Sequence, residues 1–203
     1  MTFKEFVKKL FSLFPLLNQV RCRRLFKSLE PLVLERCEGL NVGDPNGTCE
    51  CVSVSRYSKK GRVTDEEYLF RFIFDPKDVI DGKVVSTHFD DVSMCGLSTN
   101  RADTDEVTGD LRARGEQLAA TRKTKPGEPP NSLFCVFPAR CMEIRKLTTP
   151  NGSRSFRIFD TAKKENPDHA DVFQWKASQA RAERKKQRKR LRDLFIPKEL
   201  QGE

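Results

Sequence analysis

The stretch Tyr68–Phe74, YLFRFIF, decides the fold class that this sequence predicts. Its residues alternate between two sides of an extended chain, because successive side chains of a β-strand point to opposite faces. The aromatic residues fall on one side: Phe70, Phe72 and Phe74. The residues between them fall on the other: Leu69, Arg71 and Ile73. Aromatic and β-branched residues favour strands, so the stretch predicts a β-strand.

Further strands are predicted on both sides of this stretch. Cys49–Tyr57 is rich in valine, and a charged loop that contains Gly61 separates it from Tyr68–Phe74, which predicts an antiparallel pair. Three later segments have the composition of strands: Leu133–Phe137, Met142–Leu147 and Ser155–Asp160. The last two flank Pro150-Asn151-Gly152, a strong turn signal, and are predicted to form a hairpin.

Helical patterns occupy the N-terminal end and one central segment. Residues 2–38 are predicted to form a helical unit, in which Pro15 starts a second helix and Pro31 ends it. Thr104 is placed to cap a central helix that reaches about Ala120. Its predicted buried face contains Val107, Leu111 and Leu118, while Gly115 weakens the helix.

A long C-terminal helix is predicted to begin at Asn166 and Pro167 and to end at Pro197. Together these elements predict an α+β fold. It consists of a helical N-terminal unit, a small antiparallel sheet with one or two packed helices, and a long basic C-terminal helix. The predicted units are residues 1–40, 41–165 and 166–203.

The positive charge of the chain is concentrated between Lys176 and Arg192. Nine lysines or arginines and a single acidic residue, Glu183, lie there, while the whole chain has a net charge of +9. A nearly neutral body with one concentrated basic element is typical of a protein that contacts a polyanion through that element. The sequence therefore predicts that the following residues contact nucleic-acid phosphates: Lys176, Arg181, Arg184, Lys185, Arg188, Lys189 and Arg192.

Two other interpretations of this basic element remain open, namely a clamp on an acidic protein partner and a merely solvated helix. Self-pairing on the helix is disfavoured, because one acidic residue cannot offset nine basic ones. The chain has no zinc-finger spacing, no heptad zipper after the basic stretch and no phosphate-binding glycine loop. Backbone contact without base recognition is therefore expected, for either RNA or DNA.

A second hypothesis makes the protein a small nuclease or a nucleotide-modifying enzyme of the toxin type. The candidate catalytic residues are His88, Arg101, Glu165 and His169, which would supply acid–base groups and an anion clamp if the fold brought them together. Helix capping and surface loops explain the same residues without catalysis, so no catalytic residue and no cofactor are predicted.

The seven cysteines are predicted to be reduced and mostly packed, because their number is odd and no secretory signal precedes them. The residues Cys49, Cys51, His88 and Cys95 could in principle bind a metal ion, but the usual close pairs of zinc ligands are missing, so no metal is predicted.

The apolar N-terminal stretch is interrupted by Glu5 and lacks a cleavage site, which favours an amphipathic helix over a signal peptide or a membrane span. A cytoplasmic protein with no membrane contact is expected.

The N-terminal helices are predicted to bind a protein partner or a second copy of the chain. Phenylalanines are distributed around the first of these helices: Phe3, Phe6, Phe11 and Phe14.

The runs 74–82, 97–101 and 166–170 resemble a pattern of small bacterial proteins. The resemblance covers about residues 70–172 and implies no activity. The function expected from the sequence is that of a non-enzymatic, nucleic-acid-binding accessory subunit in a bacterial nucleic-acid-processing or antiviral defence assembly. A protein-bridging subunit that binds an acidic partner is a further alternative.

Overall fold

The structure is a computed structural model that describes residues 3–124, 126–175, 180–198 and 200. For residues 3–15 and Ser86 it describes the backbone alone.

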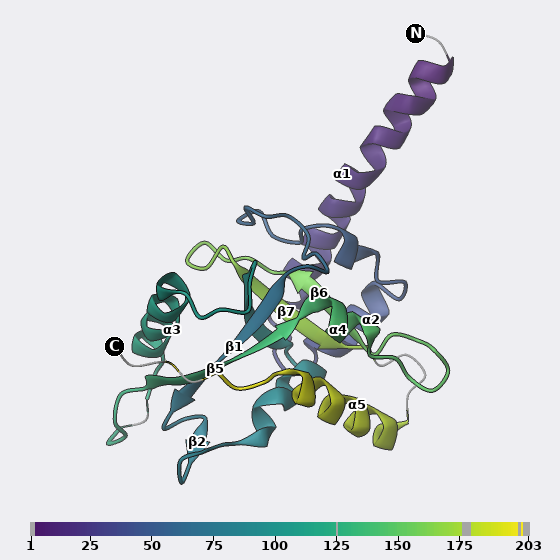
Figure 1. The fold of residues 1–203 in the computed structure, drawn as a ribbon. Helices are drawn as coiled ribbons and strands as arrows, with labels where there is room; N and C mark the ends of the chain where they lie inside the picture. Colours follow the sequence, from purple (N-terminus) through teal and green to yellow (C-terminus); the bar gives the residue numbers. More distant parts are fainter. Residues whose placement is uncertain (1–2, 125, 176–179, 199, 201–203) are drawn as a thin grey trace.

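An antiparallel sheet of five strands forms the centre of the α+β fold (Figure 1). The strands are β1 (Tyr68–Asp75), β4 (Leu97–Ala102), β5 (Ser132–Arg140), β6 (Phe156–Asp160) and β7 (His169–Gln174). Their spatial order is β5-β1-β4-β7-β6, and a small separate hairpin consists of β2 (Val79–Ile80) and β3 (Lys83–Val84). The strand predicted at Tyr68–Phe74 is confirmed, and so are those at Leu133–Phe137 and Ser155–Asp160.

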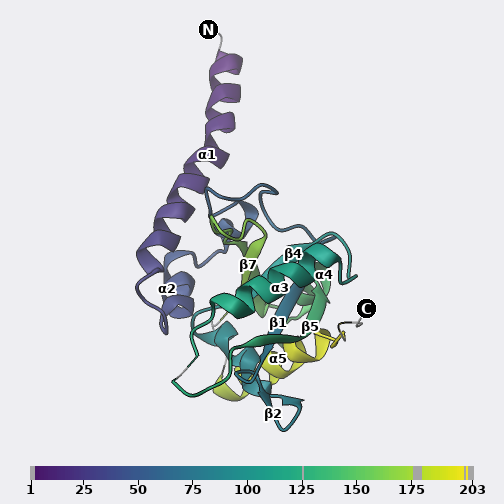
Figure 2. The same ribbon diagram turned by 90° about the vertical axis from the view of Figure 1, so that its left-hand side faces the viewer.

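Helices cover both faces of the sheet. On one face lie α1 (Phe3–Leu29), α2 (Arg36–Gly43), the 3-10 helix η1 (Thr48–Cys51) and α3 (Gly109–Thr121). On the other face lie the 3-10 helix η2 (Ser86–Ser93), α4 (Cys141–Lys146) and α5 (Arg181–Leu194). Figure 2 shows α3 lying across the strands, with α1 and α2 beside the β7 side of the sheet. The three phenylalanines of β1 pack under α3, as their alternation predicts.

The N-terminal helix α1 runs without interruption through Pro15, so the prediction of two helices there is wrong. A proline removes one backbone hydrogen bond, and the helix-forming residues on both sides continue the helix past it. The helix ends at Leu29, before Pro31, as predicted. Its first half extends away from the body (Figures 1 and 2), while Cys22 and Phe26 pack on Phe159 of β6 and Phe173 of β7.

The segment Cys49–Tyr57 is not a strand, and β1 pairs with β4 and β5 instead. The buried carboxylate of Asp44 accepts hydrogen bonds from the backbone N–H groups of Thr48 and Cys49, both at 2.9 Å, and thereby holds this segment as a 3-10 turn. Cys49 forms a disulfide with Cys22 of α1. The prediction of reduced thiols is therefore wrong for these two cysteines, whose close approach depends on helix packing that the sequence does not reveal.

The segment Met142–Leu147 was expected to be a strand, but it forms the helix α4. Its first backbone N–H groups, those of Cys141 and Met142, donate to the carbonyl oxygens of Glu67 and Asp65, at 2.9 and 3.2 Å. These long-range contacts satisfy groups that a helix leaves unpaired at its start. The turn at residues 150–152 is present, with Gly152 at a φ of +79°, but it joins α4 to β6 and not two strands of a hairpin.

The long helix predicted from Asn166 is also wrong, because residues 169–174 form the strand β7 and the helix begins only at Arg181. All six residues of β7 are buried. A strand covered on both faces loses the alternation of apolar and polar residues that identifies a strand in a sequence.

The central helix α3 begins at Gly109, later than predicted, because Thr108 and not Thr104 is the capping residue. The Thr108 hydroxyl accepts a hydrogen bond from the Leu111 N–H at 3.3 Å. Gly115 faces the sheet, and a Cβ there would lie 2.6 Å from a methyl group of Leu133. The glycine therefore allows the helix to approach the strands closely.

Candidate nucleic-acid interface

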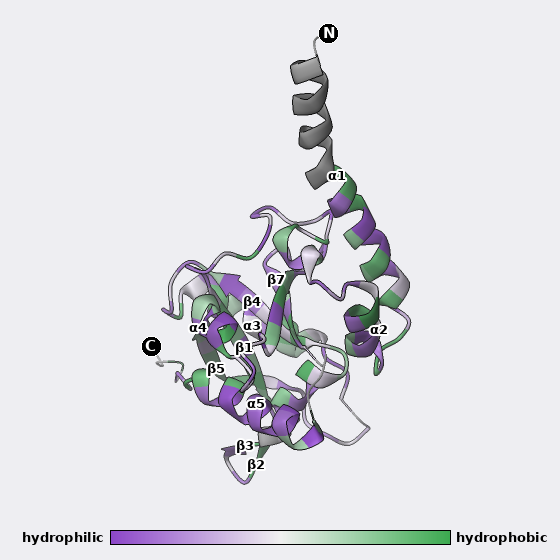
Figure 3. Cartoon of the chain, turned by 90° about the vertical axis from the view of Figure 1, so that its right-hand side faces the viewer, coloured by the Kyte–Doolittle hydropathy of each residue, from purple (hydrophilic) through white to green (hydrophobic). Residues whose placement is uncertain are grey.

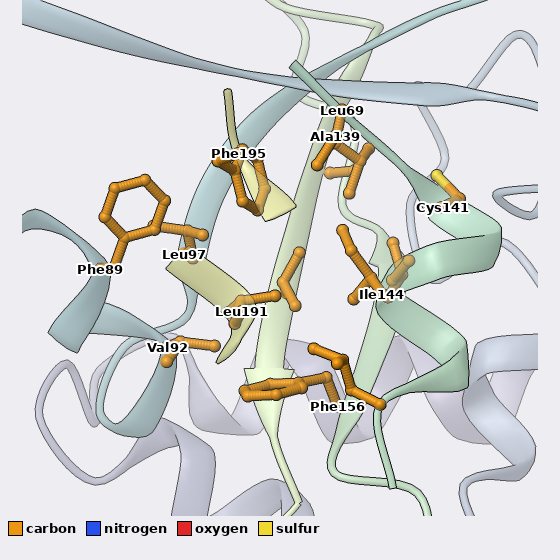
Figure 4. Packing of buried hydrophobic residues seen from close by; sticks show 14 of the residues in the cluster. Leu69, Phe89, Val92, Leu97, Ala139, Cys141, Ile144, Phe156, Leu191 and Phe195 are labelled. Carbon is orange, nitrogen blue, oxygen red and sulfur yellow. The ribbon is translucent and has the colours of Figure 1, made fainter. Parts of the chain in front are cut away.

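The basic helix α5 is anchored to the sheet by a narrow apolar edge. Leu191 is completely buried, and the ring centroid of Phe195 lies 5.3 Å from that of Phe89 in η2. Figure 4 shows Leu191 and Phe195 among the side chains of the sheet and of α4. A hydrogen bond from the Gln174 side chain of β7 to the Arg184 carbonyl, at 2.8 Å, fixes the first turns of the helix.

The opposite side of α5 presents basic side chains to solvent, and Figure 3 shows this side as the hydrophilic part of the helix. The exposed basic residues are Arg181, Lys185, Lys186, Lys189 and Arg190. Among the residues that the structure describes, no carboxylate forms an ion pair with any of these five. Arg190 donates to two neutral acceptors, the Thr148 carbonyl and the Gln187 side chain, at 3.0 and 3.1 Å. The positive charge of this face is therefore uncompensated.

Three of the predicted contact residues are paired or partly buried within the chain. Arg188 forms an ion pair with Asp90 of η2 at 3.1 Å, and Arg192 lies 3.7 Å from the neighbouring Asp193. Arg184 is partly buried, and its backbone carbonyl accepts the hydrogen bond from the Gln174 side chain. Lys176 lies outside the described residues. Lys186 and Arg190 belong to the exposed set but were not among the predicted contacts, although they lie in the same basic run.

Arg101 is a structural residue in the core. Its Nε and one terminal nitrogen both donate to the carboxylate of Glu67 at 2.7 Å, and the other terminal nitrogen lies 3.4 Å from Asp160. Burial alone would lower the pKa of Arg101, but the hydrogen bonds and the charge of Glu67 outweigh it and raise the pKa. Because its donors are occupied, this guanidinium has no position free for a substrate.

The two histidines do not form one site. His88 lies in η2 with its Nε2 3.2 Å from Asp78, whereas His169 is buried in β7. Glu165 and His169 line a common pocket, which His88 and Arg101 do not line. Of the four candidate catalytic residues, the fold thus brings only Glu165 and His169 together.

His169 is held as a neutral imidazole by its surroundings. Its Nδ1 lies 2.9 Å from the Thr161 hydroxyl and 3.2 Å from the Thr161 carbonyl, and because a carbonyl can only accept, Nδ1 carries the proton. The Thr161 hydroxyl donates in turn to Asp171. Burial lowers the pKa of His169 to about 4.

The stability of the protein should therefore decrease in mild acid. Between pH 6.5 and pH 4 the unfolded chain binds a proton at His169 and the folded chain does not, so the free energy of unfolding should fall by roughly 3 kcal/mol across this window. Urea unfolding at several pH values measures the decrease, and His169→Asn should show less of it. An NMR titration in which the His169 imidazole gains its proton near pH 6.5 would contradict this assignment.

The cysteines and histidines do not assemble a metal centre in the described part of the chain. No group of three or more His, Cys, Asp or Glu side chains there could hold a metal ion, and Cys49 is bonded to Cys22. Burial raises the pKa of the Cys141 thiol to about 12 and that of Cys135 to about 11. These two cysteines behave as packed, protonated thiols.

Among the described residues, no helix combines the length and the apolar character that crossing a lipid bilayer requires. Comparison of the chain with protein-family models, with curated proteins and with solved structures yields no match.

Proposed function

We propose that this protein binds nucleic acid by contacting the phosphate backbone with the exposed side of α5. The observation that carries the proposal is the set of five exposed, uncompensated basic side chains on a helix whose other side is buried in the core. Because Leu191 and Phe195 anchor the helix, its charges are held in place and are not spread over a mobile tail. Such a surface attracts polyanions and loses little entropy on binding them.

The dimensions of the helix suit a phosphate backbone. Arg181 and Arg190 are nine residues apart, which corresponds to about 14 Å along a helix. Duplex DNA carries one negative charge per ~1.7 Å of its axis, so several phosphates lie within this span. Lysine and arginine contacts to phosphates carry no base information, and binding should be independent of sequence.

The protein acts in this proposal as a non-enzymatic accessory subunit of a bacterial nucleic-acid-processing or antiviral defence assembly. An acidic protein partner is the competing occupant of the same helix side, because carboxylates also pair with lysine and arginine.

Binding isotherms across a salt series test the proposal. Labelled duplex DNA, single-stranded DNA and single-stranded RNA are each titrated with the intact chain between 50 and 200 mM salt. Five phosphate contacts predict a slope of about −4.5 for duplex DNA in a plot of log affinity against log salt concentration. Absence of binding to all three, together with capture of an acidic polypeptide, would refute the proposal and favour the protein-bridging alternative.

The N-terminal helices support a second part of the proposal, the binding of a further protein chain. Leu16 and Leu17 of α1 are 57% and 64% exposed, and the turn that follows the helix exposes Leu32, Val33 and Leu34. Apolar side chains gathered on one unit are typical of a protein contact. Sedimentation equilibrium of the intact chain and of the Leu16→Glu/Leu17→Glu variant tests self-association. A monomer in both cases would restrict the proposal to a different protein.

A further inference from the structure

A pocket of about 330 Å³ lies between α3 and the sheet, on the face opposite to α5. Its walls come from β1, β4, the C-terminal end of α3 and the loop between β6 and β7. Figure 2 shows how α3 crosses the sheet without covering the whole face. The volume is near the lower end of the range for small-molecule sites, so the pocket suits a small ligand.

The charged groups around this pocket are mainly positive. Four basic residues line it: Arg71, Arg114, Arg122 and Lys163. Glu165 is the acidic residue that lines it, and its side chain belongs to the exposed loop at the edge of the pocket. The apolar part of the wall comes from Phe72, Phe74 and Leu118. The pocket thus combines a cationic part with an apolar part.

Arg122 faces Phe74 in this pocket, and the carboxylates of Asp78 and Asp91 are the acidic groups that act on it. Its guanidinium carbon lies 4.1 Å from the ring centroid of Phe74, and the group is only partly exposed. Within the described residues it forms no hydrogen bond and no ion pair, so its N–H groups have no protein acceptor. A guanidinium whose N–H groups lack a protein acceptor can donate hydrogen bonds to an anionic ligand.

Arg71 lies where β1 and β4 separate, beyond the last residue pair that joins them, Phe70 and Asn100. One terminal nitrogen donates to the Ser98 carbonyl at 2.9 Å, and the other donates to the His88 carbonyl at 3.3 Å and lies 3.4 Å from Asp91. The remaining donor, Nε, is buried without a hydrogen-bond partner among the described residues. A native structure seldom leaves such a donor unpaired unless a ligand or a water supplies the acceptor.

The two guanidinium groups repel each other. Burial lowers the pKa of Arg71, Asp91 and Asp78 act in the opposite direction, and the charge of Arg122 is a smaller contribution that lowers the pKa. Burial likewise lowers the pKa of Arg122, and Asp78 and Asp91 offset only part of this effect. An anion between the two groups would relieve the repulsion and accept hydrogen bonds from both.

We propose that this pocket binds a small phosphate monoester with a planar or apolar body, of the kind represented by a nucleoside monophosphate. The phosphate group lies between Arg71 and Arg122, where Arg71 can donate one hydrogen bond through Nε and Arg122 can donate two from its guanidinium. The body of the ligand packs against Phe72 and Leu118. The neutral His169, whose Nδ1 is bonded to Thr161, offers Nε2 as an acceptor for a hydroxyl or amino group.

Isothermal titration calorimetry with nucleoside 5′-monophosphates, the matching nucleosides and inorganic phosphate tests the proposal. At least one monophosphate should bind ten times more tightly than its nucleoside and than inorganic phosphate. A 5′-phosphorylated dinucleotide distinguishes the source of the ligand. Tighter binding of the dinucleotide than of the monophosphate would assign the pocket to a strand end, and weaker binding to a free nucleotide.

Arg122→Gln should weaken the binding of the monophosphate at least tenfold. Arg112→Gln is the matched control, because Arg112 lies on α3, the helix that Arg122 follows as its C-cap residue, and does not line the pocket. A variant with neutralised charges on α5 should bind the monophosphate as the unmodified chain does, because α5 lies on the other face of the sheet. Equal binding of nucleoside and monophosphate, or full binding by a folded Arg122→Gln variant, would overturn the proposal.

Discussion

Neutralising four exposed cations of α5 should weaken the binding of duplex DNA by about 10³-fold at 100 mM salt. The variant changes Arg181, Lys185, Lys186 and Lys189 to glutamine, all of them exposed and without an ion pair to a described carboxylate. Each phosphate contact releases counterions, so the loss of four contacts should also reduce the salt slope from about −4.5 to about −1. Glutamine is a good helix former and these side chains do not enter the core, so thermal unfolding should be nearly unchanged.

The matched control removes the same number of charges from elsewhere on the surface. It changes four exposed lysines outside α5 to glutamine: Lys27, Lys59, Lys123 and Lys164. If the position of the charge matters, this variant should retain most of the affinity and the steep salt slope. Equal weakening in the two variants would show that net charge alone, and not the basic side of α5, determines binding.

Replacing Arg101 by methionine should lower the free energy of unfolding by about 3–5 kcal/mol. Methionine has a similar length but no charge, so the buried carboxylates of Glu67 and Asp160 would lose their cation. An uncompensated buried charge costs more than the lost hydrogen bonds themselves. Urea unfolding followed by circular dichroism measures the change, and the double variant Arg101→Met/Glu67→Gln should recover part of it.

The surface pair of Arg112 and Glu116 is the control for this experiment. The two side chains are joined by an ion pair of 3.1 Å on the exposed side of α3. Arg112→Met should change the free energy of unfolding by less than about 0.5 kcal/mol, because exposed pairs are solvated and screened. A similarly small effect of Arg101→Met would show that Arg101 is not needed for the fold and would make a functional role for it worth testing again.

The segment that contains the candidate interface was predictable from the sequence, because a run of basic residues is a local feature, but its individual contact residues were only partly predictable. Nine basic residues with one acidic residue form an unusual run. Three of the seven predicted contacts that it contains are exposed and form no ion pair with a described carboxylate: Arg181, Lys185 and Lys189. Lys176 lies outside the described residues, so its predicted contact stays a prediction. The pairing of Arg188 was not predictable, because Asp90 lies 98 positions away in the chain.

The errors in the predicted fold have a common origin in long-range contacts. Residues 169–174 were assigned to a helix because a strand buried on both faces shows no alternation. The segment Met142–Leu147 has apolar residues that suit either a strand or a helix, and the contacts to Asp65 and Glu67 decide in favour of α4. Arg101 was grouped with reactive residues because the sequence does not show its distance from Glu67 in the fold.

The sequence by itself determined the strand at the start of the sheet and the position of the concentrated positive charge. Both follow from the order of residues within one short segment, because that order alone shows which side of an element is apolar and where basic residues are concentrated. The tertiary structure alone decided which charges remain exposed, which cysteines are paired and where the pocket lies. These properties depend on residues such as Arg71 and Arg122, or Cys22 and Cys49, that the folded chain brings together across large separations.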